Sequence, residues 1–254
     1  MLGMATALGL LYLLAPIIVV IATAFGDSPY PLFPPPGFTL RWFTKVWNTQ
    51  AFHDAALVSA KLGLVSALLA TVIGTFSAIA LSRLRFRGRA FVAVVLLSPI
   101  VFPSIILGLA LLVAFHRVGL AQTFAGMVAG HTVLVTPFVI RLVMASYAEF
   151  DPAVEEAARN LGAGWWRILF RITLPLIRPG VLAGAVFAFI ISFDEVVITL
   201  FLAGPGLQTL PIRIFTYVEY SSDATVSAIS TIVMAMWFIV GVPIYVRFLA
   251  VRPK

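Results

Sequence analysis

The chain has 254 residues, of which 61% are hydrophobic and 11% are charged. Soluble domains carry about a quarter charged residues because their surface must be hydrated, so this composition excludes a soluble enzyme and indicates a bilayer protein. The absence of cysteine excludes disulfides, thiolate metal sites and a cysteine nucleophile. The net charge of +7 could indicate nucleic acid, but in a membrane protein an excess of Lys and Arg first reflects topology.

Six apolar stretches are long enough to cross the hydrocarbon core of a bilayer, which takes roughly 20 helical residues. The third contains Pro99 and Pro103, which membrane helices tolerate where neighbouring groups satisfy the freed carbonyls. The sequence predicts an all-α membrane protein, one domain over residues 1–254, with six transmembrane helices near Ala5–Phe25, Leu57–Leu81, Ala90–Phe115, Phe124–Val143, Val181–Leu202 and Thr225–Val246.

The 17 Lys and Arg residues are unevenly distributed between the two sides of these spans. Twelve lie in or around the connections after the second and fourth spans or follow the sixth span, including Arg247, Arg252 and Lys254, whereas four lie on the other side. The positive-inside rule then predicts that both termini are cytoplasmic, as are the Arg83–Arg89 loop and the long connection at about 144–180. Anionic lipid headgroups account for the arginine-rich loop, so we expect the lipid bilayer and no nucleic acid as its partner.

Two further segments favour contacts without defining the partner. Small residues repeat every four positions in the second span and allow close approach of a helix from this chain or from another: Ser66, Ala70, Gly74 and Ala78. The external connection Gly26–Asp54 has aromatic residues interleaved with Arg41 and Lys45. Such a segment suits the headgroup region of the bilayer or an external partner protein.

The motifs of nucleotide binding and catalysis are missing from the sequence. A P-loop needs Gly-Lys followed by Ser or Thr, and no lysine here follows glycine, so we expect no ATP hydrolysis by this chain. The three histidines are too scattered for a zinc site. His131, at the start of the fourth span, is expected to make an interhelical hydrogen bond rather than to bind a ligand.

The cytoplasmic connection contains two short amphipathic helices. Asp151-Pro152 is typical of a helix start, and Gly162 of a helix stop. Between them, apolar residues from Val154 to Leu161 form one face, and we expect Glu155 and Glu156 on the opposite, polar face. A second helix with Trp165, Ile168, Leu169 and Ile172 on one stripe follows. The pair could lie on the bilayer or could meet a protein surface.

This connection resembles the EAA signature of permease subunits of bacterial ABC importers. Glu156-Ala157-Ala158, Gly162 and Ile172-Thr173-Leu174-Pro175 reproduce its identities and spacing. The resemblance implies the type I ABC importer permease fold, a single transmembrane permease domain and no catalytic activity. It also implies that the segment couples this chain to an ATPase through Glu156, Ala157, Ala158, Gly162, Leu174 and Pro175.

A finer resemblance, to the spermidine/putrescine permease group of PotC type, extends over most of the chain. It is carried by segments such as Arg83-Leu84-Arg85-Phe86-Arg87-Gly88, Gly130-His131-Thr132 and Ser192-Phe193-Asp194-Glu195. It implies a bacterial cytoplasmic (inner) membrane location and a polyamine or similar cation as solute. Its implied partners are a second permease subunit in a heterodimer, two ATPase subunits that bind ATP and Mg in place of this chain, and an external solute-binding protein.

Two consecutive acids lie within the fifth span. Each carboxylate costs about 2.5–3.5 kcal/mol at the centre of a membrane helix, so Asp194 and Glu195 must face polar surroundings. On a continuous helix Glu195 shares a stripe with Ser192 and Thr199, which predicts a substrate pathway there. The alternatives are that both acids pair with neighbouring helices, or that they belong to an ion-coupled secondary transporter.

Overall fold

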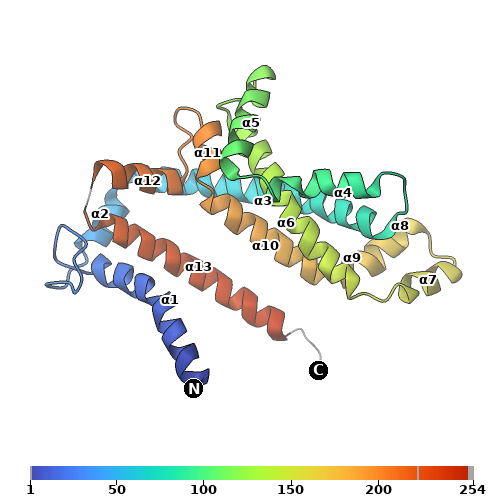
Figure 1. Ribbon diagram of the computed structural model, residues 1–254, viewed down its shortest axis with the longest axis horizontal. Helices are drawn as coiled ribbons and strands as arrows, with labels where there is room; N and C mark the ends of the chain where they lie inside the picture. The colour runs from blue at the N-terminus through green and yellow to red at the C-terminus, as the bar shows by residue number, and fades with distance from the viewer. Residues whose placement is uncertain (1, 222, 251–254) are drawn as a thin grey trace. The chain divides into compact units, whose positions relative to one another are not determined.

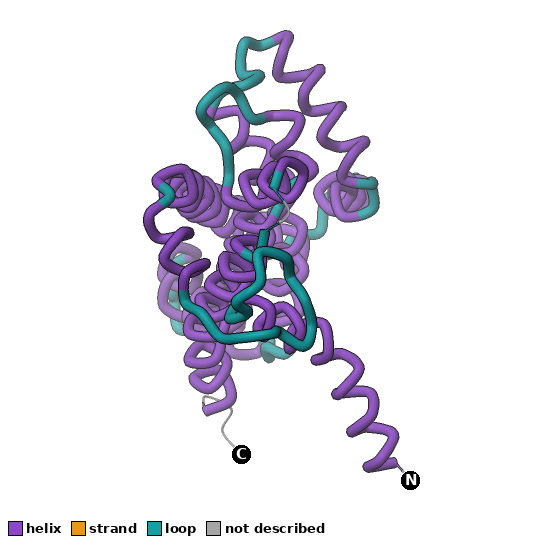
Figure 2. The backbone as a smooth tube through the Cα atoms, turned by 90° about the vertical axis from the view of Figure 1, so that its left-hand side faces the viewer, coloured by secondary structure: helices purple, strands orange, loops and turns teal. Residues whose placement is uncertain are grey.

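The computed structural model describes residues 2–221 and 223–250. In these ranges the chain consists of helices and connecting loops, with no strand (Figure 2). Four of the described helices are long and apolar enough to cross a membrane, and the number rises to six if each of two bent helix pairs counts as one span. The all-α prediction is confirmed; Met1, Arg252 and Lys254 lie outside the described residues.

The chain separates into two compact units, 1–54 with 213–254 and 55–212. The unit boundaries fall inside two helices, α3 (Gln50–Arg83) and α12 (Leu210–Tyr220). The first and sixth predicted spans therefore belong to one unit, and the second to fifth predicted spans belong to the other.

The first unit contains α1 (Leu2–Ala24), α2 (Arg41–Asn48) and α13 (Thr225–Ala250). The C-terminal end of α1 packs against α13, where the hydroxyls of Thr23 and Ser227 are hydrogen-bonded at 3.1 Å. Toward its N-terminus α1 is exposed on all sides, as a helix that faces lipid or another apolar surface would be. The predicted first and sixth spans are confirmed as apolar helices.

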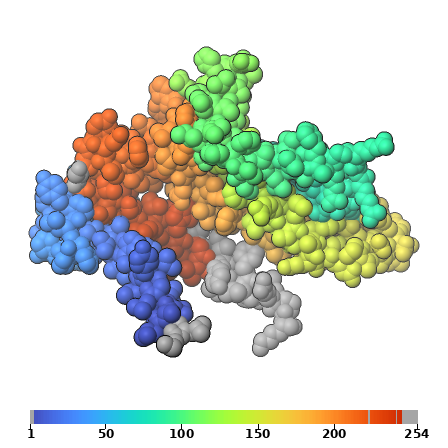
Figure 3. Space-filling view, viewed as in Figure 1, coloured from blue at the N-terminus to red at the C-terminus, as the bar shows by residue number. Residues whose placement is uncertain are grey.

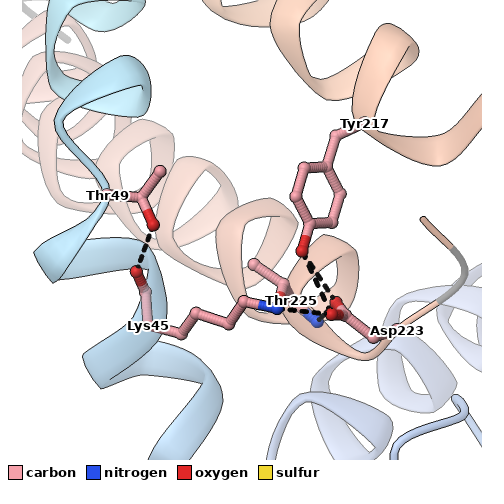
Figure 4. A network of polar contacts seen from close by, with 5 residues as sticks. All are labelled: Lys45, Thr49, Tyr217, Asp223 and Thr225. Carbon is pink, nitrogen blue, oxygen red and sulfur yellow. Dashed lines mark hydrogen bonds and ion pairs between the residues drawn. The ribbon is translucent and has the colours of Figure 1, made fainter. Parts of the chain in front are cut away.

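A polar network holds the segment predicted to be external, Gly26–Asp54, to the start of α13 (Figure 4). Lys45 Nζ lies 2.6 Å from Asp223 Oδ2, and the hydroxyl of Tyr217 donates to the same carboxylate. The backbone N–H of Thr225 donates to Asp223 Oδ1 at 2.9 Å. On the same helix, the indole of Trp42 is buried and donates to the Gly26 carbonyl at 2.9 Å. The aromatic segment is therefore anchored within its own chain as well as exposing aromatic surface.

The second unit is built around α6 (Phe124–Ala148), the most deeply buried of the long helices. Helix α10 (Arg178–Asp194) runs along it (Figure 1). Two glycines allow the approach: a Cβ at Gly180 would lie 2.8 Å from the Leu142 carbonyl oxygen, and one at Gly184 would lie 3.1 Å from Val139. Since the Leu142 oxygen belongs to the backbone, no side-chain rotation could make room at Gly180.

The small-residue face of α3 meets α6 of the same chain. Ser66, Ala70 and Ala78 are fully buried, and the Ser66 hydroxyl donates to the Val128 carbonyl. A Cβ at Gly74 would lie 2.8 Å from Val139 Cβ. The sequence left open whether this face packs against a helix of this chain or of another chain. In the structure it packs against a helix of this chain.

The predicted third span is not one continuous helix. It consists of α4 (Arg89–Leu97), η1 (Ser98–Ile100) and α5 (Ser104–Arg117), and the two halves are bent by 106°. The break coincides with Pro99 and Pro103, which lack the N–H that a continuous helix requires. Hydropathy identified the segment, but the expectation of a single helix over Ala90–Phe115 was wrong.

The remaining elements of the second unit are the short helices on either side of α10. They are α7 (Ala153–Asn160), α8 (Trp165–Ile168), the π-helix η2 (Leu169–Thr173), α9 (Leu174–Leu176) and α11 (Val197–Leu202).

Replacement of Lys45 by methionine should lower the stability of the first unit by about 0.5–1 kcal/mol, a small value because water screens this partly exposed pair. Burial raises the pKa of Asp223, but hydrogen bonds from Lys45, Thr225 and Tyr217 outweigh it and hold that pKa below its ordinary 3.8. Hydrogen bonds to Asp223 and Tyr217 raise the pKa of Lys45 above 10.5. The contribution of the Lys45–Asp223 pair to stability is therefore present above pH 3.8 and is lost as pH falls through the lowered pKa of Asp223.

Thermal unfolding in detergent at neutral and at acidic pH measures this effect. The difference between wild type and Lys45→Met should shrink in acid, whereas Lys61→Met, at an exposed lysine of α3, should match wild type throughout. A difference that persists unchanged in acid would contradict the ion pair.

Candidate functional site

The coupling segment of the sequence forms the helix α7 at its predicted place. Asp151 Oδ1 accepts from the N–H of Ala153 at 2.9 Å, which caps the start of the helix. Gly162 lies just after its end with a φ of +80°, the left-handed conformation that glycine adopts without steric cost. The predicted start and stop of this helix are confirmed. Figure 3 shows the segment in yellow at the surface of the second unit.

Helix α7 exposes residues of both its apolar and its polar face. Val154, Ala157 and Leu161 are exposed, Leu161 by 89%. Glu155, expected on the polar face with Glu156, is instead 3% exposed and is the buried residue of the helix. The prediction for Glu155 was wrong because the sequence did not reveal Arg83 as its partner: the two side chains form an ion pair. The apolar residues Val154, Ala157 and Leu161 are therefore exposed together with Glu156.

The second part of the segment is less regular than the single amphipathic helix predicted. It comprises α8, η2 and α9, and Trp165–Leu176 meets α10 at a bend of 67°. Ile168 and Leu169 are buried as expected, but Trp165 is 49% exposed. Of the predicted coupling residues here, Leu174 is half-buried and Pro175 is exposed.

The fifth span is interrupted at the two acids. Helix α10 ends at Asp194, Glu195 has extended backbone with φ −70° and ψ 119°, and α11 begins at Val197. The 17 residues of α10 cover about 25 Å, which is less than the hydrocarbon core. The prediction of a continuous helix over Val181–Leu202 was wrong. Because Ser192, Glu195 and Thr199 do not lie on one helix, the helical periodicity that placed them on one stripe does not apply.

The backbone groups freed by this break are satisfied by side chains. Glu195 Oε1 accepts from the N–H of Ile198 at 3.0 Å, and the Thr199 hydroxyl donates to the Glu195 carbonyl at 2.8 Å. A break at membrane depth needs such partners because lipid offers none. Glu195 therefore has a structural role at the break, in addition to any role toward a solute.

His131 of α6 forms hydrogen bonds to both sides of the break. Its Nδ1 lies 2.8 Å from Ser192 Oγ, and its Nε2 lies 3.0 Å from Thr199 Oγ1. The single hydroxyl proton of Thr199 is donated to Glu195, so Thr199 must accept from Nε2–H. A ring that is fully buried favours the neutral form, in which Nε2 carries the proton and Nδ1 accepts from the Ser192 hydroxyl. The predicted interhelical hydrogen bond of His131 is confirmed.

The four predicted pathway residues therefore differ in their surroundings. Ser192 and Thr199 are 1% and 0% exposed and direct their hydroxyls at His131. Asp194 is exposed and Glu195 is half-buried, at the C-terminal end of α10. The carbonyls at a helix C-terminus carry partial negative charge, so this end of α10 favours a cation. Among the described residues, no three His, Asp or Glu side chains gather as a metal site.

The fold and site define a multi-pass helical membrane protein with the short helix α7 exposed at its surface. The chain belongs to the family described as binding-protein-dependent transport system inner membrane component, whose model matches residues 70–253. It is a permease subunit with the type I ABC importer permease fold, located in the inner membrane, and it is not an enzyme. The family assignment does not support the ion-coupled secondary transporter.

Two relatives and one solved structure illustrate the similarity. The chain is 36% identical over 225 residues to the spermidine/putrescine transport system permease protein PotC of Escherichia coli (strain K12), covering 89% of this chain and 85% of that protein. It is 32% identical over 242 residues to the putrescine transport system permease protein PotI of the same strain, covering 92% and 85%. A bacterial ABC transporter involved in the import of alginate matches with a TM-score of 0.74 at 17% identity, over 99% of this chain and 96% of that chain.

Replacement of His131 by alanine should destabilise the protein by about 1–3 kcal/mol, because two buried hydroxyls lose their partner. Thermal unfolding in detergent measures the loss, with His116→Ala at an exposed histidine as the matched control. Nitrogen-15 NMR of labelled histidine should show a protonated Nε2 and an unprotonated Nδ1. Equal stability of the two variants, or a protonated Nδ1, would contradict these hydrogen bonds of His131.

Proposed function

We propose that this subunit forms half of the translocation pathway for a small organic cation of the polyamine class. The observation that carries the proposal is the 36% identity, over 89% of the chain, to a permease named for spermidine and putrescine. The structure supports it with two acids at the end of α10, where the helix dipole also favours positive charge. Two carboxylates attract a polyamine without holding it as tightly as a dedicated binding site would.

The subunit works in an assembly driven by ATP. A second permease subunit completes the pathway in a heterodimer, and two ATPase subunits bind ATP and Mg, which this chain does not bind. The family description, binding-protein-dependent, supports an external solute-binding protein. Both termini are cytoplasmic, on the side of the coupling segment and of the Arg83–Arg89 loop.

The coupling segment docks in the ATPase through the outward side of α7. Val154, Glu156 and Ala157 are exposed there, and the small Ala side chains permit close approach of a protein surface. A helix of eight residues has little stability of its own in water, so its caps at Asp151 and Gly162 define the shape that the partner meets. Leu174 and Pro175 complete the segment where it turns toward α10.

Replacement of Gly162 by valine should leave insertion intact but weaken ATPase binding by about 5- to 30-fold, because a β-branched residue with positive φ costs about 1–2 kcal/mol. The matched control is Gly164→Val, since Gly164 has the extended φ of −68° that valine adopts freely. A Cβ added at either glycine would meet no atom within 4 Å, so the two variants differ only in backbone strain.

Pull-down of the ATPase and ATP-dependent uptake measure this prediction. Glu156→Lys, which reverses an exposed charge on α7, should show the same uncoupling. Normal pull-down and uptake in a stably inserted Gly162→Val protein would show that the segment does not dock through this helix.

Neutralising Glu195 with glutamine should lower uptake of spermidine, by about tenfold if one charge contact of about 1.4 kcal/mol is lost. The glutamine oxygen still accepts from Ile198, so the break itself is preserved. ATPase stimulation by the loaded binding protein should largely survive. Uptake by the reconstituted complex is the measurement, with Glu219→Gln, an exposed acid of α12, as the charge-matched control.

A panel of solutes in the same assay tests the proposed solute class. Spermidine and putrescine should compete with each other, whereas anionic solutes should not compete. Unchanged spermidine uptake in Glu195→Gln would remove this residue from the pathway, and transport of an anion would remove the polyamine proposal.

A further inference from the structure

Glu155 attaches the coupling helix to the rest of its own chain. It is the buried residue of α7, 3% exposed, on a helix whose neighbouring side chains point outward. It is not part of the Glu156-Ala157-Ala158 motif. A carboxylate removed from water in this way requires compensation by charge and hydrogen bonds.

Several elements of the second unit supply that compensation. Arg83, the last residue of α3, forms an ion pair with Glu155, and its side chain is 10% exposed. Thr173, fully buried in η2, donates its hydroxyl to Glu155 Oε1. Arg159, one turn further along α7, lies 3.5 Å from Glu155 Oε2 but is 53% exposed. Tyr147 of α6 also faces this carboxylate.

The two buried partners lie at the ends of elements that lead into the membrane. Arg83 ends a helix of 34 residues, about 51 Å long, which extends beyond the hydrocarbon core. Thr173 ends η2, which continues through α9 into α10 and on to the break at Asp194. A displacement of α7 would therefore act on both helices through one carboxylate.

We propose that Glu155 is the positioning residue that links the coupling helix to α3 and α10. The inference rests on the proposed function, in which an ATPase moves α7. Helix α7 is too short to keep its place by its own stability, and its outward residues are used by the partner. The Glu155 network sets where α7 lies relative to α3, and it transmits the displacement of α7 to the transmembrane helices.

The test is uptake per ATP hydrolysed in the complex reconstituted in proteoliposomes. Glu155→Gln should still assemble with the ATPase and hydrolyse ATP at the basal rate, but its spermidine uptake per ATP should fall by roughly tenfold. Glu149→Gln removes an exposed carboxylate before the same segment and should behave as wild type. Because Arg83 and Glu155 act as a pair, Arg83→Gln with Glu155→Gln should lose no more than either single variant.

A second readout follows the position of α7 in the purified chain without ATPase. Since the chain has no cysteine, spin labels can be placed at exposed Leu161 and at exposed Arg87 beyond the end of α3. The distance distribution between the labels should be narrow in wild type and broader in Glu155→Gln. If Glu155→Gln fails to insert, Thr173→Val, which removes one hydrogen bond and keeps the shape, should show the same changes to a smaller extent.

The inference would be overturned if Glu155→Gln showed wild-type uptake per ATP and an unchanged label distribution. If Glu155→Gln does not insert, the same results in Thr173→Val would overturn it. Either outcome would leave the proposed function intact. Absence of ATP-dependent spermidine uptake by the wild-type complex would instead count against the proposed function. The label measurement on the purified chain would then still decide whether Glu155 positions α7.

Discussion

A polar group that leaves water must find its partner within the chain, and this constraint governs the break in the fifth span and the position of α7. In hydrocarbon an unpaired N–H or C=O costs several kcal/mol, so a helix can break at membrane depth only where side chains replace the lost bonds. At the break in the fifth span, Glu195 accepts from Ile198, and Thr199 donates back to Glu195. His131 then bonds to both sides of the break. On helix α7, Glu155 is buried because Arg83 and Thr173 compensate its charge. These polar clusters, rather than apolar packing alone, determine where helices stop and how the stops are oriented.

The sequence predicted the features that depend on local signals. Apolar length located the spans, and Asp151 with Gly162 located the ends of the coupling helix, because capping chemistry acts over a few residues. The sequence did not predict the features that depend on contacts between residues distant in the chain. Glu155 was predicted on a polar face because its partner Arg83 lies far away in the sequence. The break at Glu195 was not predicted because no proline or glycine lies next to it. In the third span the prolines were visible, but hydropathy cannot tell a tolerated proline from a sharp bend. His131 was placed correctly because a histidine inside a span has few other options.

The arrangement of α10 explains how two distant sites can be related. Its preceding segment is held through Thr173 to the Glu155 cluster, and its far end is held through Ser192 to His131. Along its length it packs closely on α6, where Gly180 and Gly184 leave no room for a side chain. A helix fixed at both ends and closely packed between them moves as a unit rather than bending, since packed interfaces deform little. In the proposed coupling, a displacement of the segment that precedes α10 therefore reaches the acids at the break.

The two kinds of carboxylate in this chain suit different tasks for a physical reason. Glu155 is buried with a full charge partner, so a change in its surroundings is costly and the geometry is well defined. Asp194 and Glu195 lie at an exposed or half-buried helix end, where water and helix carbonyls would share the stabilisation of a cation in the proposed pathway. A transport pathway needs this weaker attraction because a solute held as firmly as Arg83 would not be released. In the proposed function, strong pairing keeps α7 in position, and the weaker attraction at the end of α10 lets a charge pass.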